Sequence, residues 1–170
     1  MVKWIPNQRH LVKINPTGPI TQISPSSIFD WYDSPAGTTI DPNNNIYYVQ
    51  VRDTPQSNSS WLYGIDLSTG NVVSSVLLAN AQEFHQMKFN CKDSTLYAIM
   101  VKWSPNERYL VKINPSNGQI TQISPSSIFD WYDTPAGTTI DPNNNIYYVQ
   151  VKDTPQSNSS WLYGIDLSTG

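Results

Sequence analysis

Hydrophobic and polar positions alternate over short stretches of this chain, and this pattern predicts β-strands. Four such stretches recur in a fixed order: 136–141 (AGTTID), 146–151 (IYYVQV), 161–167 (WLYGIDL) and, in the earlier copy, 72–78 (VVSSVLL). The second stretch is apolar on both of its alternating faces, whereas the fourth is thinner and more polar. The pattern therefore predicts four-stranded sheets with buried inner strands and a solvated outer strand.

The chain also repeats itself at two lengths. Residues 1–70 return as 100–170 with mild changes, such as His10 to Tyr109, and with one inserted residue, Asn117. A weaker repeat, whose unit is about half as long, is seen where 89–99 aligns with 140–149. We therefore predict an all-β chain of β-propeller blades, each with four antiparallel strands and about 50 residues, in two alternating types.

Turn residues separate the predicted strands. The segments 41–45 (DPNNN) and 66–71 (DLSTGN) are rich in Asn, Asp and Gly, which tolerate tight and left-handed turns. Asp41, Asn43 and Asn45 also resemble the start of a calcium loop, but the glycine and the distal glutamate of such a loop are missing. A hairpin turn is the favoured interpretation, and no metal site is predicted.

Two segments resemble known propeller repeats. Residues 62–73 (LYGIDLSTGNVV) resemble the signature between the third and fourth strands of quinoprotein-type repeats, and 40–49 (IDPNNNIYYV) is similar to that between the first and second strands of NHL-type repeats. The resemblance implies blades over nearly the whole chain but no particular activity, because such blades serve enzymes, lectins and scaffolds. Quinoprotein enzymes need a full ring and a calcium-bound cofactor site, neither of which we find, so no cofactor is expected.

Counting strands divides the single tandem array, 1–170, into four parts. A partial blade at 1–24 holds the end of a second strand with a third and a fourth, complete blades follow at 35–79 and 84–124, and a partial blade at 135–170 holds the first three strands. Because unpaired strand edges promote association, we expect the end blades to be completed between chains. Two chains joined head to tail would form a six-bladed dimer; a filament, or a window from a longer array, is the alternative.

Composition narrows the classes of function. A content of 38% hydrophobic residues suits a globular core, and 14% charged residues with 13 prolines suit strands and turns. The net charge of −3 offers no surface for nucleic acid, and no apolar run is long enough for membrane insertion. The N-terminus lacks the apolar core of a signal peptide, so any secretion signal lies outside this chain. The single Cys91 excludes an intrachain disulfide and is expected to be a small buried hydrophobe.

One face of the predicted ring collects the candidate ligand-binding residues, which are two copies of a Trp-Tyr-Asp triplet: Trp31, Tyr32, Asp33, Trp131, Tyr132 and Asp133. Their rings could stack on a sugar and their carboxylates could bind its hydroxyls, which would make the protein a lectin-like propeller. Alternatively, Ile28, Trp31 and Tyr32 have helical spacing and would form a short turn that plugs the gap between blades.

The remaining signals in the sequence concern the location of the protein and catalysis. Asn58 and Asn158 begin Asn-Ser-Ser sequons for glycosylation, which fits an extracellular or cell-surface location. His10 and His85 are the only histidines, and no nucleophile motif or phosphate loop accompanies them. We expect a non-catalytic structural or assembly protein whose partners are further copies of itself. The alternative is a carbohydrate-binding propeller with glycans as partners.

Overall fold

The protein is described by a computed structural model that covers residues 9–29, 34–52, 59–78, 83–103, 106–129, 134–152 and 159–170. These residues form thirteen strands and no helix. Accordingly, the described part of the chain holds no helix that could cross a membrane.

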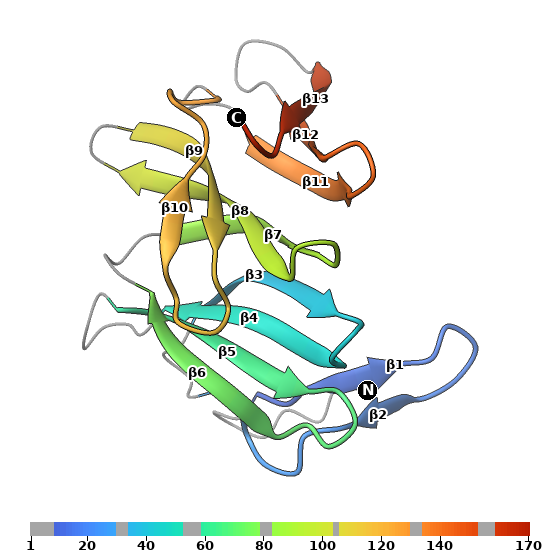
Figure 1. The fold of residues 1–170 in the computed structure, drawn as a ribbon. Coiled ribbons are helices and arrows are strands. Elements are labelled where there is room, and N and C mark those ends of the chain that lie inside the picture. The colour runs from blue at the N-terminus through green and yellow to red at the C-terminus, as the bar shows by residue number, and fades with distance from the viewer. Residues whose placement is uncertain are drawn as a thin grey trace.

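The strands form four antiparallel sheets in chain order (Figure 1). The N-terminal hairpin consists of β1 (Val12–Ile14) and β2 (Ile20–Gln22). The first blade consists of β3 (Ser34–Asp41), β4 (Ile46–Arg52), β5 (Ser60–Asp66) and β6 (Val72–Leu78). The second blade consists of β7 (Glu83–Asn90), β8 (Thr95–Trp103), β9 (Asn106–Ile113) and β10 (Ile120–Gln122). The C-terminal sheet consists of β11 (Thr134–Asp141), β12 (Ile146–Lys152) and β13 (Ser160–Asp166).

Each blade is a meander in which consecutive strands are neighbours, in the orders β3-β4-β5-β6 and β7-β8-β9-β10. The innermost strand of all three larger sheets has a register irregularity at the same place, between Pro35 and Thr38, His85 and Lys88, and Pro135 and Thr138. The prediction of an all-β fold with four-stranded antiparallel blades is confirmed.

The turn between the first and second strands of each sheet is held by side chains. The Asp41 carboxylate accepts hydrogen bonds from the backbone N–H of Asn43 at 2.9 Å and of Asn44 at 3.2 Å. Asn45 closes the turn with a φ of 57°, a left-handed conformation that asparagine tolerates better than most residues. The hairpin interpretation of this segment is therefore confirmed.

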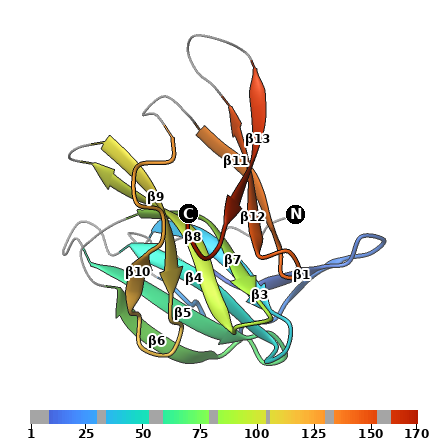
Figure 2. The ribbon, with the colours of Figure 1, turned by 45° about the horizontal axis from the view of Figure 1, so that its top comes forward.

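The core lies between successive sheets. Leu62 and Leu78 of the first blade pack with Phe84 and Val111 of the second blade, among other residues. The next layer joins the second blade to the C-terminal sheet, and a smaller layer joins the N-terminal segment to the first blade. Figures 1 and 2 show these sheets following one another through the molecule, with the N-terminal hairpin projecting to one side.

The prediction that Cys91 is buried is wrong. Its side chain is exposed, because it begins the turn at residues 91–94 between β7 and β8. A turn position at the rim of a blade leaves a small thiol in contact with water, so Cys91 contributes nothing to the core.

Candidate functional site

The two Trp-Tyr-Asp triplets, Trp31 to Asp33 and Trp131 to Asp133, lie outside the described residues, as do the sequon residues Asn58 and Asn158. The segment that precedes the first triplet is described. The backbone N–H of Ile28 donates to the carbonyl of Arg9 at 2.8 Å, and the ring of Phe29 meets that of Tyr63 edge-on at 5.3 Å. This segment therefore packs on the blade that follows it.

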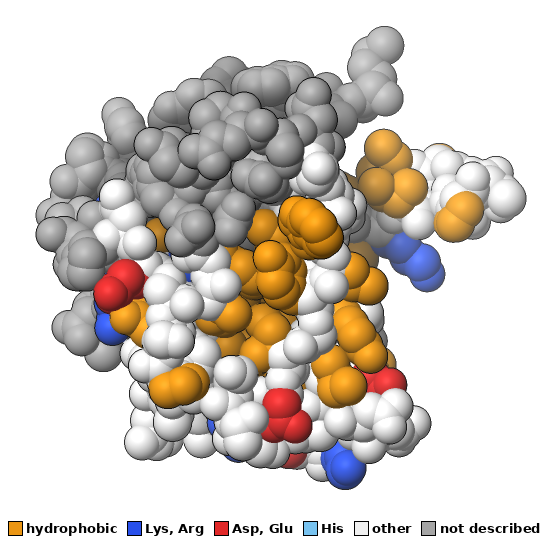
Figure 3. Space-filling model, turned by 90° about the horizontal axis from the view of Figure 1, so that it is seen from above, with side chains coloured by type: hydrophobic (Ala, Val, Ile, Leu, Met, Phe, Trp, Pro, Cys, Tyr) orange, Lys and Arg blue, Asp and Glu red, His pale blue; other side chains and the backbone are white. Residues whose placement is uncertain are grey.

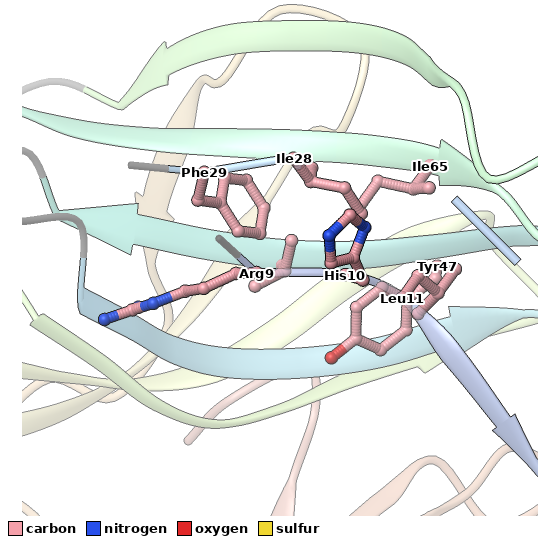
Figure 4. A pocket seen from close by; sticks show the side chains of 8 residues that line it. Arg9, His10, Leu11, Ile28, Phe29, Tyr47 and Ile65 are labelled. Carbon is pink, nitrogen blue, oxygen red and sulfur yellow. The ribbon is translucent and has the colours of Figure 1, made fainter. Parts of the chain in front are cut away.

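A cavity of about 160 Å³ opens beside that segment (Figure 4). The described residues that line it are mostly apolar. The Nδ1 atom of His10 lies 3.1 Å from Nε2 of Gln22 and 3.3 Å from Oγ of Ser24, so polar neighbours from the same hairpin hold this ring. The lining residues are Arg9, His10, Leu11, Ile28, Phe29, Tyr47, Val49 and Ile65.

The equivalent place between the second blade and the C-terminal sheet is filled. There Tyr147, the counterpart of the half-buried Tyr47, is fully buried and packs in one core cluster with Tyr97 and Ile99 of β8. The hydroxyl of Tyr147 donates to the backbone carbonyl of Gln86 in β7 at 2.5 Å. Among the described residues, the cavity thus lies at the position where β7 and β8 pack in the next joint.

The titratable groups of the described residues have structural neighbours. Glu83 lies 3.8 Å from Arg52 and 3.5 Å from His85, at the ends of strands from two adjacent blades. Burial raises the pKa of Tyr97 and Tyr147 well above the usual 10.0, and the hydrogen bond from Tyr97 to Asp93 adds to the effect. No three His, Cys, Asp or Glu side chains within the described ranges gather into a metal-binding group.

The most distinctive surface is the outer face of the C-terminal sheet, which we call the open C-terminal face. It comprises Gly137, Thr139, Ile146, Tyr148, Gln150 and Leu162, and it repeats, residue for residue, the face of the first blade that the second blade covers. Leu162 is 72% exposed, whereas its counterpart Leu62 is 1% exposed. Figure 3 views the molecule from the end that carries this sheet and shows hydrophobic side chains gathered there.

Polar groups show the same contrast. Gln50 is fully buried, and its Oε1 accepts a hydrogen bond from the backbone N–H of Phe84 in the second blade at 3.0 Å. Its counterpart Gln150 is exposed. A Cβ on Gly37 would lie 2.7 Å from the carbonyl oxygen of Phe84, whereas a Cβ on Gly137 would meet only Oε1 of Gln150, at 3.8 Å. The C-terminal sheet therefore presents a blade-binding face with no blade on it among the described residues.

Sequence reasoning missed this face, although it predicted that the last sheet would have three strands. The available signal was the exact recurrence of 60–66 as 160–166, because a copied strand carries the same apolar positions as the strand that packs against the second blade. An exposed apolar face that repeats a buried one is a candidate interaction surface.

Comparison with known proteins identifies a family. The crystal structure of puromycin hydrolase aligns with a TM-score of 0.49 and 14% sequence identity, over 84% of this chain and 23% of the length of that protein. No curated protein matches the chain. A family described as "Repeat of unknown function (DUF6923)" matches residues 1–126, in agreement with the predicted repeat. Since this match spans most of the sequence, the chain belongs to the DUF6923 repeat family.

Proposed function

We propose that this protein is a non-catalytic assembly module, a tandem of four-stranded blades whose open end binds a further copy of the chain. The observation that carries the proposal is the 72% exposure of Leu162 beside the 1% exposure of Leu62 in the same strand sequence. Gln50 and Gly37 also contact the second blade, whereas their counterparts Gln150 and Gly137 contact no blade among the described residues.

The stabilisation available from covering this face is appreciable. Full burial of a leucine side chain contributes about 1.5–3 kcal/mol, and most of that is unrealised at Leu162. Tyr148 and Ile146, both half-buried, add further apolar area at the same place. Their counterparts Tyr48 and Ile46 pack against the second blade, so the chain itself forms the equivalent contact between its first and second blades.

The free edge of the C-terminal sheet adds a second attraction. In the first blade, β5 pairs along its length with β6, from Ser60 opposite Leu78 to Ile65 opposite Val72. Its copy β13 pairs only with β12 among the described residues. Unpaired N–H and C=O groups along a strand favour the addition of another strand.

The shifted pKa values of two tyrosines have a structural explanation, which also supports a role without catalysis. Among the described residues, the strongest pKa shifts fall on Tyr97 and Tyr147, which lie in the core between two sheets, so burial accounts for them. An extracellular location remains part of the proposal through the sequons at Asn58 and Asn158. The lectin-like alternative rests on the two Trp-Tyr-Asp triplets.

The native mass tests this function. Light scattering and native mass spectrometry over a range of protein concentrations are expected to give masses of two or more chains, with association that strengthens as concentration rises. Leu162→Asp should reduce the mass to that of one chain, because it places a charge on the open C-terminal face. Leu77→Asp is the matched control, since Leu77 is an exposed leucine of β6 that lies away from this face. A wild-type protein that stays a single chain at every concentration would contradict the proposal.

A further inference from the structure

A second exposed apolar surface lies at the other end of the described chain. The N-terminal hairpin exposes Val12, Ile14 and Ile20, with exposed fractions of 42%, 67% and 52%. Figures 1 and 2 both show this hairpin projecting from the body of the molecule. Three exposed β-branched residues on so small a hairpin are an unusual surface for a soluble domain.

The second blade shows what this surface is built to contact. Its outer strands β9 and β10 carry the same sequences, VKI and ITQ, and the counterparts of the three exposed residues are Val111, Ile113 and Ile120. Val111 and Ile113 are fully buried, and Ile120 packs against the same cluster. That cluster includes Leu62 and Leu78 of the first blade. In the second blade, the same residues therefore belong to the core cluster in which Leu62 of β5 is buried.

Since β13 repeats β5 and the hairpin repeats parts of β9 and β10, two separate sheets of the described chain expose the two halves of a joint that the first and second blades form intact. We propose that the N-terminal hairpin of one copy packs on the open C-terminal face of a second copy, with Val12, Ile14 and Ile20 against Leu162 and Tyr148. This inference rests on the proposed function and names the two surfaces that carry it.

The geometry of the hairpin supports this pairing. Successive side chains of a strand point to opposite faces, so Lys13 lies on the other side of β1 from Val12 and Ile14, and its charge stays out of the joint. The hairpin corresponds to outer strands, so it covers the outer part of the face around Leu162. Gly137 and Gln150, whose counterparts contact β7, lie beyond its reach.

The two surfaces differ from one another, so the contact is heterologous and has a direction. Repetition of a heterologous contact produces a closed ring or an open filament, according to the rotation between copies. A contact between two identical ends would stop at a dimer. This difference makes the proposal testable with variants that each block one end.

The experiment mixes two such variants. Leu162→Asp blocks the open C-terminal face and leaves the hairpin intact, whereas Ile14→Asp blocks the hairpin and leaves the face intact. Each variant alone is expected to be a single chain. An equimolar mixture, with one variant labelled with ¹⁵N, should give a dimer containing one labelled and one unlabelled chain in native mass spectrometry, and no larger species. Val73→Asp, at an exposed valine of β6, is the matched control and should assemble as the wild type does.

The outcomes separate this inference from the function on which it rests. A wild-type protein that never associates overturns both. If the wild type associates and Ile14→Asp associates equally well, the hairpin is not the partner surface and this inference fails while the proposed function stands. A mixture that remains single chains also overturns it, provided that each variant keeps the far-ultraviolet circular dichroism of the wild type. Ile20→Asp provides a second hairpin variant if Ile14→Asp fails that requirement, and the same mixing result is expected from it.

Discussion

Replacing the same leucine in two copies of one strand measures how much a neighbouring blade contributes to stability. Leu62 and Leu162 occupy the same position in β5 and β13, whose sequences are identical. Leu62→Ala removes a side chain that is buried between the first and second blades, and such a change costs about 2–5 kcal/mol because it leaves a cavity. Leu162 has only about a quarter of its surface covered, so the same scale gives about 1 kcal/mol or less for Leu162→Ala.

The assay is unfolding in urea, followed by far-ultraviolet circular dichroism at a protein concentration below that of any association. The free energy of unfolding falls linearly with urea concentration, so a lower midpoint at an unchanged slope reports a loss of stability. Leu62→Ala should lower the midpoint clearly and Leu162→Ala only slightly. Leu77→Ala, at an exposed leucine of β6, provides the reference for a surface leucine.

Equal losses at the two positions would refute the reasoning, because local sequence and strand pairing would then decide the cost instead of blade stacking. Repeating the titration at higher protein concentration extends the test. Association raises the apparent stability of the folded chain by mass action, so the wild-type midpoint should rise and the Leu162→Ala midpoint should rise less.

Two further predictions use the same assay. Gly37→Ala should lower the free energy of unfolding by about 1–3 kcal/mol, because its Cβ would lie 2.7 Å from the carbonyl oxygen of Phe84, whereas Gly137→Ala should have little effect, and equal effects would argue against the tight approach. Burial raises the pKa of Tyr147 above its usual 10.0, so the folded chain holds this proton more tightly than the unfolded chain does. Stability should therefore be complete below the usual pKa and fall as the pH rises above it, and Tyr147→Phe should make that fall shallower; an unchanged pH profile would contradict the assignment.

Local patterns predicted the strands well because their causes are local. The outer strand predicted at 72–78 is β6, and the strand predicted at 146–151 is β12 with one further residue. Alternation of side chains and the turn chemistry of Asp41 act over a few residues, so the sequence reports them directly. The burial of Cys91 was predicted wrongly from the general preference of cysteine, although its alignment with Pro142 in the repeat already placed it in a turn.

The open C-terminal face could not be predicted from local sequence, for a physical reason. Leu62 and Leu162 have the same neighbours along the chain and opposite exposure. Burial in a blade array depends on the sheet that lies next in space, so two identical strands can differ completely in what they contact. Only the order of whole blades distinguishes the two leucines, because that order determines which sheet lies against each of them.

The joint between the first and second blades has an evolutionary consequence. Strands from both sides of this joint are copied elsewhere in the sequence, since β3 to β5 recur as β11 to β13 and the VKI and ITQ segments of β9 and β10 recur as β1 and β2. Unequal recombination can therefore add or remove whole segments, and every new junction is already a fitting one. The number of blades in such a chain is then a heritable quantity set by the copy number of the segment, which selection can raise or lower without any new contact having to evolve.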